Sequence, residues 1–238
     1  MDFDESIDRR DTHSEKWDAM EARYGVSNHD GISMWIADMD FRPPQAVQNA
    51  LSKMLEHGIY GYFGNQNEYL DSIQWWMKHR HNWDVPREGI FTTHGLVNGT
   101  AMCIDTFTHP GDGVILFTPV YHSFAKVIKA NNRQIIEMEL VNNNGRYEMD
   151  FETYDEIIPT NARMVIFCSP HNPGGRVWSQ TELKQLADFV NRHNLILVSD
   201  EIHHDLTFGA KHTPMVHING VKDRLIMMTA TTKTFNIA

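Results

Sequence analysis

The chain has little cysteine and little clustered positive charge, and each shortage excludes classes of protein. Cys103 and Cys168 are the only cysteines among its 238 residues. Each lies in an apolar run, so both are expected to be reduced core residues of a cytoplasmic protein rather than parts of a disulfide framework. The 21 basic residues are outnumbered by 31 acidic ones, the net charge is −10, and no basic run occurs. Because phosphate binding needs clustered lysine or arginine, nucleic acid is not an expected partner.

Long apolar runs and nucleotide-binding motifs are also missing. No run approaches the roughly 18 apolar residues that span a bilayer, so no membrane partner is expected. Three of the first five residues are acidic and none is basic, whereas a signal peptide opens with positive charge. Neither G-x-G-x-x-G nor G-K-[ST] occurs. The chain does have an apolar content of 41%, which is ample for a core, and its length suits one large domain or one domain and a fraction.

The periodicity of apolar residues divides the chain into an arm and a larger domain. Residues 1–42 are mixed and aromatic, and are expected to pack on another part of the protein. From residue 43 on, helical spacing begins: Pro43 and Pro44 suit a first helical turn, and Gly58 suits its end. A second helix is predicted over residues 68–79, with Met77 among the residues on its inner side.

Short apolar runs then alternate with helical segments, which predicts the fold class. The runs cover residues 90–92, 114–117, 164–168, 195–199 and 225–229. Ser179 and Glu182 form a capping box before one of the intervening helices. Continuous apolar strands alternating with helices predict an α/β fold of three layers, αβα, with a mainly parallel sheet. Ligands of such sheets bind beyond the carboxyl ends of the strands, so the polar residues that follow each run are the candidates for a site.

The first two runs are followed by residues that suit a phosphorylated aromatic ligand. Gly95, Leu96 and Val97 lie where a strand leads into a helix, and their free N–H groups together with the helix dipole would favour a phosphate. The alternative is an ordinary strand-to-helix turn. Tyr121 follows the second run and could stack on an aromatic ring, although a half-buried tyrosine with a satisfied hydroxyl is commoner.

The next two runs are followed by an amide and a carboxylate. Asn172 stands in a stiff turn of two prolines and two glycines, residues 169–175, and could donate to a ligand oxygen or simply cap the turn. Asp200 could pair with a protonated ring nitrogen, and His203 could donate to a ring substituent. A metal site is the rival interpretation here. It is not favoured, because the neighbours His203 and His204 diverge on a strand or a helix and H-E-x-x-H is absent.

The last run leads into Thr232 and Lys233. A lysine in a semi-enclosed setting loses its proton more easily than a solvated one and can form a Schiff base with a carbonyl cofactor. Most single lysines are surface charges. The ordered series of phosphate turn, aromatic side chain, fixed amide, carboxylate and lysine nevertheless supplies what an aromatic phosphorylated aldehyde needs.

These motifs resemble a known family, the pyridoxal-phosphate (PLP) enzymes of the aspartate-aminotransferase fold, class I/II, and within it the MalY/PatB-type cystathionine β-lyases. The resemblance runs from about Phe3 to the last residue, and its motifs cover residues 34–41, 60–62, 169–173, 175–178, 200–203 and 232–237. It implies that Lys233 binds PLP covalently, that Asp200 holds the ring nitrogen protonated, and that Asn172 and His203 hydrogen-bond the ring's phenolic oxygen.

The resemblance also assigns the remaining site residues. Tyr121 stacks on the ring, while Gly95, Leu96, Val97 and Thr232 bind the phosphate. Tyr62 reaches a phosphate in the neighbouring subunit, which implies a homodimer. Ala37 and Asp38 border the substrate carboxylate, and Tyr121 and Asn172 are assigned to substrate binding as well. Ala230 stands where many aminotransferases have serine, so one phosphate contact differs.

The reaction implied by the resemblance is α,β-elimination of an amino acid such as cystathionine to a thiol, pyruvate and ammonia, as in methionine biosynthesis. Transamination is the alternative, because it uses the same residues for its first steps. A third possibility is an inactive fragment. Family members continue for roughly 150 residues beyond this point, into a small C-terminal domain that supplies further arginines. Residues 43–238 are therefore expected to be an incomplete PLP-binding domain of poor stability and little activity by itself, with two inner strands left unpaired.

Overall fold

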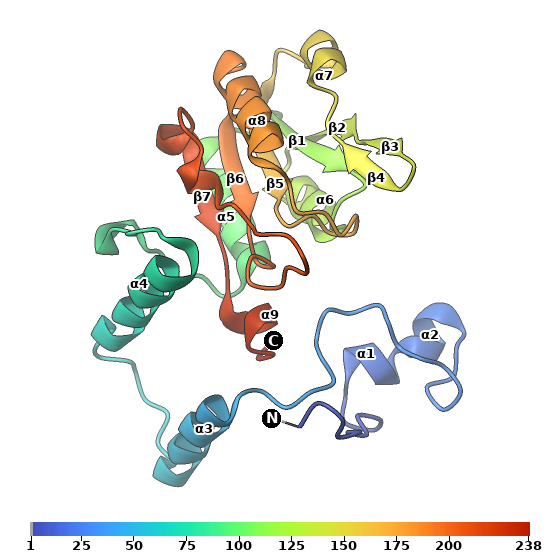
Figure 1. Cartoon of the computed structure of the whole chain (residues 1–238), viewed down its shortest axis with the longest axis vertical. Helices are drawn as coiled ribbons and strands as arrows, with labels where there is room; N and C mark the ends of the chain where they lie inside the picture. The colour runs from blue at the N-terminus through green and yellow to red at the C-terminus, as the bar shows by residue number, and fades with distance from the viewer. Residues whose placement is uncertain (1) are drawn as a thin grey trace. The chain divides into compact units, whose positions relative to one another are not determined.

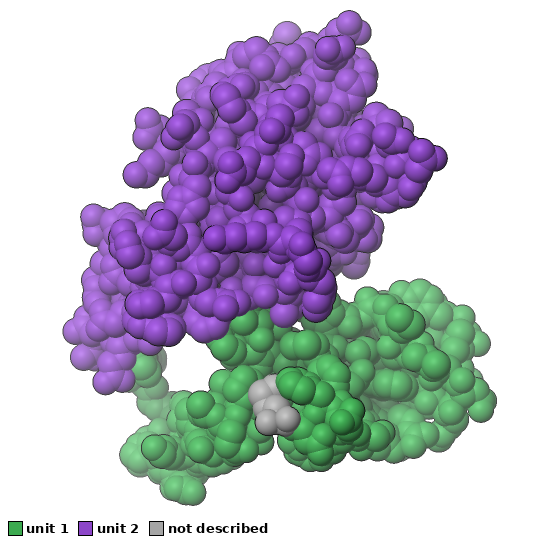
Figure 2. Space-filling model, in the orientation of Figure 1, with its two compact units in different colours: residues 1–63, 231–238 green, residues 64–230 purple. Residues whose placement is uncertain are grey.

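The computed structural model describes residues 2–238, and its contacts fall into two compact units. The larger unit is Gly64–Ala230, and the smaller combines Met1–Phe63 with Thr231–Ala238 (Figure 2). The predicted boundary at residue 42 concerns domains rather than these units and stays a prediction.

The larger unit is built on a five-stranded sheet of order β2-β1-β5-β6-β7 (Figure 1). All four pairings are parallel, as the alternation of apolar runs and helices predicted. The strands are β1 (Gly113–Thr118), β2 (Gln134–Glu139), β5 (Ala162–Cys168), β6 (Ile196–Asp200) and β7 (Leu225–Met228).

Successive residues of the inner strands point to opposite faces of the sheet, and each face has its own core. Ile115 and Phe117 of β1 pack with the helices α7 (Phe151–Ile157) and α8 (Gln180–Arg192). Val114 and Leu116 pack with α5 (Leu96–Phe107) and α6 (Ser123–Ala130). Helices therefore cover both faces, which confirms the three-layer αβα architecture.

Local sequence signals fix the helix ends. The capping box forms as predicted: Ser179 Oγ accepts from Glu182 N, and Glu182 Oε2 accepts from Ser179 N. Asp150 caps α7 in the same way, with its side chain accepting from Thr153 N. Gly58 ends the helix after Pro44 at a φ of 71°, a conformation that costs glycine least.

The predicted strand at residues 90–92 is wrong. These residues follow the 3-10 helix η1 (Arg87–Gly89) as an irregular segment, and Phe91 is 85% exposed. A strand needs a neighbour for its backbone hydrogen bonds, and in the described residues this segment has no strand beside it. The related expectation of two unpaired inner strands is corrected as well: residues 90–92 form no strand, and among the described residues β7 is the edge strand at that end of the sheet, with β2 at the other.

Sequence reasoning missed β2, whose burial is mixed. Strands β3 (Val141–Asn143) and β4 (Arg146–Glu148) form an antiparallel hairpin closed by Asn144 and Gly145. Two short 3-10 helices, η2 (Met215–His217) and η3 (Lys222–Arg224), lead into β7. The helix α4 (Asn67–His81) buries only Met77 and His81.

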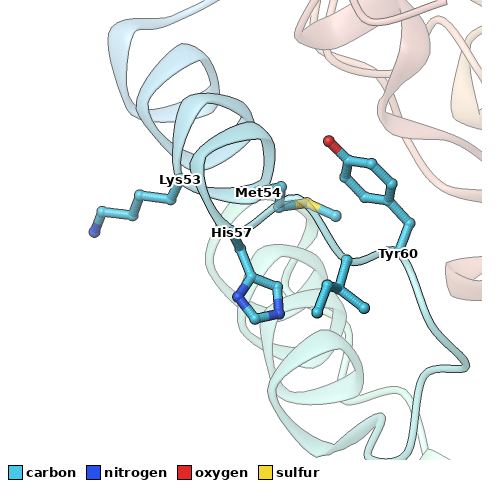
Figure 3. Close-up of a pocket in the computed structure, with 5 residues that line it drawn as sticks. Lys53, Met54, His57 and Tyr60 are labelled. Atoms are coloured by element: carbon cyan, nitrogen blue, oxygen red, sulfur yellow. The ribbon is translucent and has the colours of Figure 1, made fainter.

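The smaller unit holds four short or isolated helices: α1 (Glu15–Asp18), α2 (Met20–Tyr24), α3 (Gln45–His57) and α9 (Thr231–Thr234). Helix α3 buries none of its residues. A shallow hollow of about 240 Å³ lies at its end, where Met54 and Tyr60 contribute to the lining and Lys53 points away (Figure 3). Among residues 2–238, no helix is both long and apolar enough to cross a membrane.

Candidate active site

The carboxyl ends of β1, β5 and β6 form the edge of the sheet where the predicted residues gather. From β1 the chain runs to β2 on one side, and later returns to β5 on the other side of β1. The strand order therefore reverses between β1 and β5, and open α/β sheets bind ligands at such a point. Tyr121 follows β1, Asn172 follows β5, and Asp200 is the last residue of β6.

Asp200 is the last residue of β6 and is only 6% exposed. It pairs in register with Cys168 of β5 and Met228 of β7, so its position is fixed from both sides. Its Oδ1 accepts a hydrogen bond from Ile202 N at 3.1 Å. Burial, and then the charge of Asp200, raise the pKa of the Cys168 thiol to about 12. A buried carboxylate thus lies at the mouth of the central strands.

The loop after β5 holds Asn172 as the sequence predicted. Ser169 N donates to Asp200 O at 2.9 Å, and Asn172 N donates to Cys168 Sγ at 3.4 Å. His171 Nε2 lies 2.8 Å from Pro119 O and ties this loop to the one after β1. Burial lowers the pKa of His171, so the neutral ring donates from Nε2. In the described part of the chain, the half-buried Asn172 side-chain amide makes no hydrogen bond to other protein groups, so its two N–H donors are unpaired.

Tyr121 is half-buried on the face covered by α5 and α6. Its ring meets Phe124 edge-on, with centroids 5.5 Å apart and planes at 89°, and it contacts His122 at 5.1 Å. Edge contacts of this kind orient an aromatic ring by its quadrupole. The packing therefore holds Tyr121 in place beside the same sheet edge.

The turn at Gly95 has the form expected of an anion cradle. Gly95 is the N-cap of α5 at φ 83° and ψ 158°, a conformation that other residues adopt only under strain. A Cβ added there would meet nothing within 4 Å, so the space beside this backbone is open. No side chain caps α5, and its first-turn N–H groups, including those of Leu96 and Val97, point outward with the positive end of the helix dipole.

The segment after Asp200 forms a tight turn in which His203 stays half-buried. Sequence reasoning missed Glu201, which is fully buried. Its carboxylate accepts from Ser199 Oγ at 2.9 Å and Met215 N at 3.0 Å, and lies 2.7 Å from His212 Nε2. Glu201 N also donates to Met228 O at 2.8 Å. This carboxylate fixes the segment that carries Asp200 and His203. Sequence reasoning could not find it, because the burial of Glu201 depends on the tertiary structure.

Lys233 and Thr232 belong to the smaller unit, on α9, and both are half-buried. Three residues later Asn236 binds the backbone of the loop at residues 38–41. Met39 N donates to Asn236 Oδ1 at 2.9 Å, while Asn236 Nδ2 donates to Met39 O at 2.9 Å and Phe41 O at 2.6 Å. The segment of the lysine is thereby joined to the predicted substrate loop.

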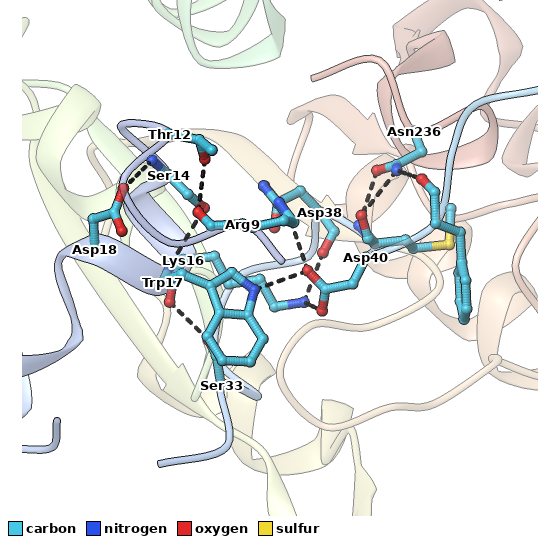
Figure 4. Close-up of polar contacts among 12 residues, drawn as sticks. Arg9, Thr12, Ser14, Lys16, Trp17, Asp18, Ser33, Asp38, Asp40 and Asn236 are labelled. Carbon is cyan, nitrogen blue, oxygen red and sulfur yellow. Dashed lines mark hydrogen bonds and ion pairs between the residues drawn. The ribbon is translucent and has the colours of Figure 1, made fainter. Parts of the chain in front are cut away.

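That loop is held by an ion-pair network (Figure 4). Arg9 donates to Asp38 Oδ2 and Asp40 Oδ1, each at 2.7 Å, and Lys16 Nζ donates to Asp40 Oδ2 at 2.7 Å. Partial burial alone would raise the pKa of Asp40, but hydrogen bonds from Lys16, Trp17 and Arg9 outweigh it and lower the pKa. Asp38 Oδ1 is buried without a hydrogen-bond partner. A hollow of about 360 Å³ lies along this loop and Asn236.

The remaining predicted residues are exposed. Ala37 precedes the network and faces solvent. The Tyr62 side chain is fully exposed, at 108%. The predicted residues thus divide between the two units: Gly95, Leu96, Val97, Tyr121, Asn172, Asp200 and His203 belong to the larger unit, and Ala37, Asp38, Tyr62, Thr232 and Lys233 belong to the smaller one.

Comparisons with known proteins point to one family. The family model described as aminotransferase class I and II matches residues 30–238. The cystathionine β-lyase PatB of Bacillus subtilis is 39% identical over 241 residues, which covers 100% of this chain and 62% of PatB. The protein MalY of Escherichia coli is 29% identical, covering 100% of this chain and 60% of MalY.

Solved structures agree. Cystalysin from Treponema denticola, whose crystal contains PLP, superposes with a TM-score of 0.92 at 40% identity, covering 99% of this chain and 61% of cystalysin. The PLP-bound C–S lyase from Staphylococcus hominis gives a TM-score of 0.89 at 32% identity, covering 100% and 60%. The chain therefore spans about three fifths of the length of the relatives it matches.

Proposed function

This chain belongs to the aminotransferase class I and II family, and on that premise we propose that it acts as a PLP-dependent C–S β-lyase. The substrate is cystathionine or a related cysteine thioether, and the products are a thiol, pyruvate and ammonia. The observation that carries the proposal is the 39% identity to the cystathionine β-lyase PatB over the whole chain.

The residues of the larger unit fit PLP. Asp200 offers a buried carboxylate for the pyridine nitrogen, and Asn172 offers an amide without a protein partner for the phenolic oxygen. Gly95 opens an uncapped helix N-terminus, which suits a phosphate. A carboxylate, an amide donor and an anion cradle along one sheet edge are the donor set that this cofactor requires.

Each residue then has a defined task. When bound, PLP supplies an aldehyde that condenses with amines and a ring that accepts the electron pair from Cα. Asp200 keeps the ring nitrogen protonated by offering a negative charge in a site poor in water. The Lys233 amine holds the cofactor between turnovers and takes the Cα proton of the substrate. Tyr121 limits the tilt of the ring, and Thr232 contributes a hydroxyl to the phosphate.

Substrate orientation falls to the loop of Ala37 and Asp38, which the Arg9 network holds in place. Elimination breaks the Cα–H and Cβ–S bonds. Sulfur departs with the electron pair, and one water converts the three-carbon remainder to pyruvate and ammonia. The exposed Tyr62 reaches the phosphate of a second subunit, so a homodimer in the cytoplasm is part of the proposal.

The test uses the full product of the gene, loaded with PLP and given cystathionine without any keto acid. We expect free thiol and pyruvate in equal amounts. Lys233→Ala should abolish both, while Lys184→Ala, an exposed lysine on α8, should leave both unchanged. Product formation that requires a keto-acid acceptor would identify an aminotransferase instead. If neither thiol nor pyruvate forms from cystathionine, with or without a keto acid, the proposal is refuted.

A further inference from the structure

A second group of chemically reactive side chains lies in the larger unit, apart from the residues assigned to PLP. His204 and Asp205 come from the turn after β6, and His81 comes from the last turn of α4. His81 Nε2 lies 3.1 Å from Asp205 Oδ1, and His204 Nε2 lies 3.2 Å from Asp205 Oδ2. The side chain of His81 is 6% exposed, and those of His204 and Asp205 are each 3% exposed. The fold thus buries two imidazoles against one carboxylate.

The spacing of these groups suits a small divalent cation. One ring nitrogen of each histidine and one carboxylate oxygen all lie within 4.8 Å of one another. Ligand atoms around tetrahedral zinc, with bonds of about 2.0–2.1 Å, are roughly 3.3 Å apart. The distances of 3.1 Å from His81 Nε2 to Asp205 Oδ1 and 3.2 Å from His204 Nε2 to Asp205 Oδ2 are hydrogen-bond lengths, and they place both rings on the same carboxylate. Two histidines, one aspartate and an open fourth position match the donors preferred by Zn²⁺ and similar transition metals.

His204 carries an independent sign of a missing ligand. Its Nδ1 is buried and has no hydrogen-bond partner, whereas Nε2 lies near Asp205 and 3.3 Å from Thr229 Oγ1. A neutral imidazole always has one N–H and one lone pair. If Nε2 donates to the carboxylate, the lone pair on Nδ1 faces no donor, and burying it in this state is unfavourable. A metal cation would accept that lone pair, because either imidazole nitrogen can serve as a metal ligand.

The surrounding charges favour a cation as well. Asp205 and the buried Glu201 each carry a carboxylate, and the ring of His212, bound to Glu201, lies 6.1 Å from that of His204. The opposing charge is Arg80, whose Nε is 3.5 Å from Asp205 Oδ1 but whose side chain is 54% exposed. Arg80 can therefore swing into solvent, while the carboxylates cannot.

We propose that His81, His204 and Asp205 bind a divalent transition-metal cation of the Zn²⁺ class, and that this cation fastens α4 to the turn after β6. Helix α4 has little other packing to hold it, because it buries only two of its residues, one of which is His81. Sequence reasoning compared His203 with His204 and dismissed a metal. The ligand that completes the set lies 124 residues away in the chain.

The test measures metal binding directly, on the holoenzyme freed of excess PLP and dialysed against a chelator. We expect one Zn²⁺ per chain by calorimetry and a rise in Tm with Zn²⁺ concentration, because a ligand that binds only the folded state stabilises it. His204→Leu should weaken Zn²⁺ affinity by about 100-fold or more. His79→Gln, an exposed histidine on the same helix, should bind as the wild type does.

The variant His204→Leu also separates this proposal from a metal-free network of hydrogen bonds. Because His204→Leu also removes the Nε2 contacts to Asp205 and Thr229, its metal-free Tm serves as its own baseline, and the discriminating readout is the loss of the rise in Tm that Zn²⁺ causes. Co²⁺ provides a second readout on the unmodified protein, because a histidine-ligated four-coordinate site gives intense visible absorption. A wild-type protein with no Zn²⁺ heat, no Tm response and only the pale spectrum of hydrated Co²⁺ would overturn the proposal. None of these readouts depends on lyase activity.

Discussion

Asn236 and Met39 form a two-way amide pair across 197 residues of chain. Met39 N donates to Asn236 Oδ1, and Asn236 Nδ2 donates back to Met39 O, both at 2.9 Å. Lys233 precedes this asparagine by one helical turn, and Asp38 precedes the methionine directly. The proposed catalytic lysine and the proposed substrate loop are therefore linked through one side chain.

Replacing Asn236 should loosen that link. Asn236→Gly removes three hydrogen bonds while tolerating the φ of 52°, so we expect a loss of about 1–3 kcal/mol in unfolding free energy. The proposed lyase should show a raised KM with a smaller change in kcat, because the substrate loop loses its anchor. Urea unfolding and steady-state kinetics measure the two effects.

Asn194→Gly is the matched control for Asn236. Asn194 has a φ of 54° and is exposed, and its side chain makes no hydrogen bond in the described structure. It should cost less in stability and leave KM unchanged. If the two variants lose stability equally, the hydrogen bonds of the Asn236 side chain contribute nothing, and the loss comes only from replacing asparagine by glycine at a positive φ.

Asp200→Asn should lower kcat strongly while changing the unfolding free energy little. The amide is nearly the same size as the buried carboxylate but cannot hold a ring proton by its charge. Losing a preorganised electrostatic partner of this kind costs about 100-fold or more in rate. Initial rates of pyruvate release measure the loss, and Asp188→Asn on the exposed face of α8 serves as the comparison. A rate within threefold of the wild type would remove Asp200 from the proposed mechanism.

Glu201→Gln should destabilise the protein by about 2–4 kcal/mol, because the fully buried carboxylate accepts from a hydroxyl and a backbone amide and pairs with His212. The expected readout is a lower urea midpoint with an unchanged m-value. Glu156→Gln, at an exposed position of α7, should lie within about 0.5 kcal/mol of the wild type. If the two variants unfold alike, the Glu201 contacts do not support the segment.

Tyr154 makes stability fall in alkali. Its hydroxyl donates to Glu139 O at 2.6 Å, and burial raises its pKa from 10.0 to about 12. A folded-state pKa above the unfolded one means that the contribution is complete below pH 10 and is lost as pH rises toward 12. The difference in unfolding free energy between pH 8 and pH 11 should therefore be smaller in Tyr154→Phe than in the wild type. Tyr60→Phe, at a 65% exposed position, should leave the wild-type difference unchanged.

Sequence reasoning succeeded where the signal is local. The ends of α8 and α3 follow from a capping box and a glycine, groups that act within one helical turn. The candidate residues could be listed in chain order for the same reason, because each follows its apolar run within a few residues. It failed at residues 90–92, where an apolar run was taken as a strand although β structure needs a partner. It also missed β2, whose mixed burial masks the apolar pattern.

The sequence by itself determined the layered α/β architecture, the family, and the residue types available to the proposed cofactor, because periodicity, caps and motifs are short-range properties. Only the tertiary structure decided which strands are neighbours, which carboxylates are buried, and which distant groups meet. The meetings of Asn236 with Met39 and of His81 with Asp205 depend on how the whole chain packs. Packing is a sum over many weak contacts between remote residues, so no local pattern records its result.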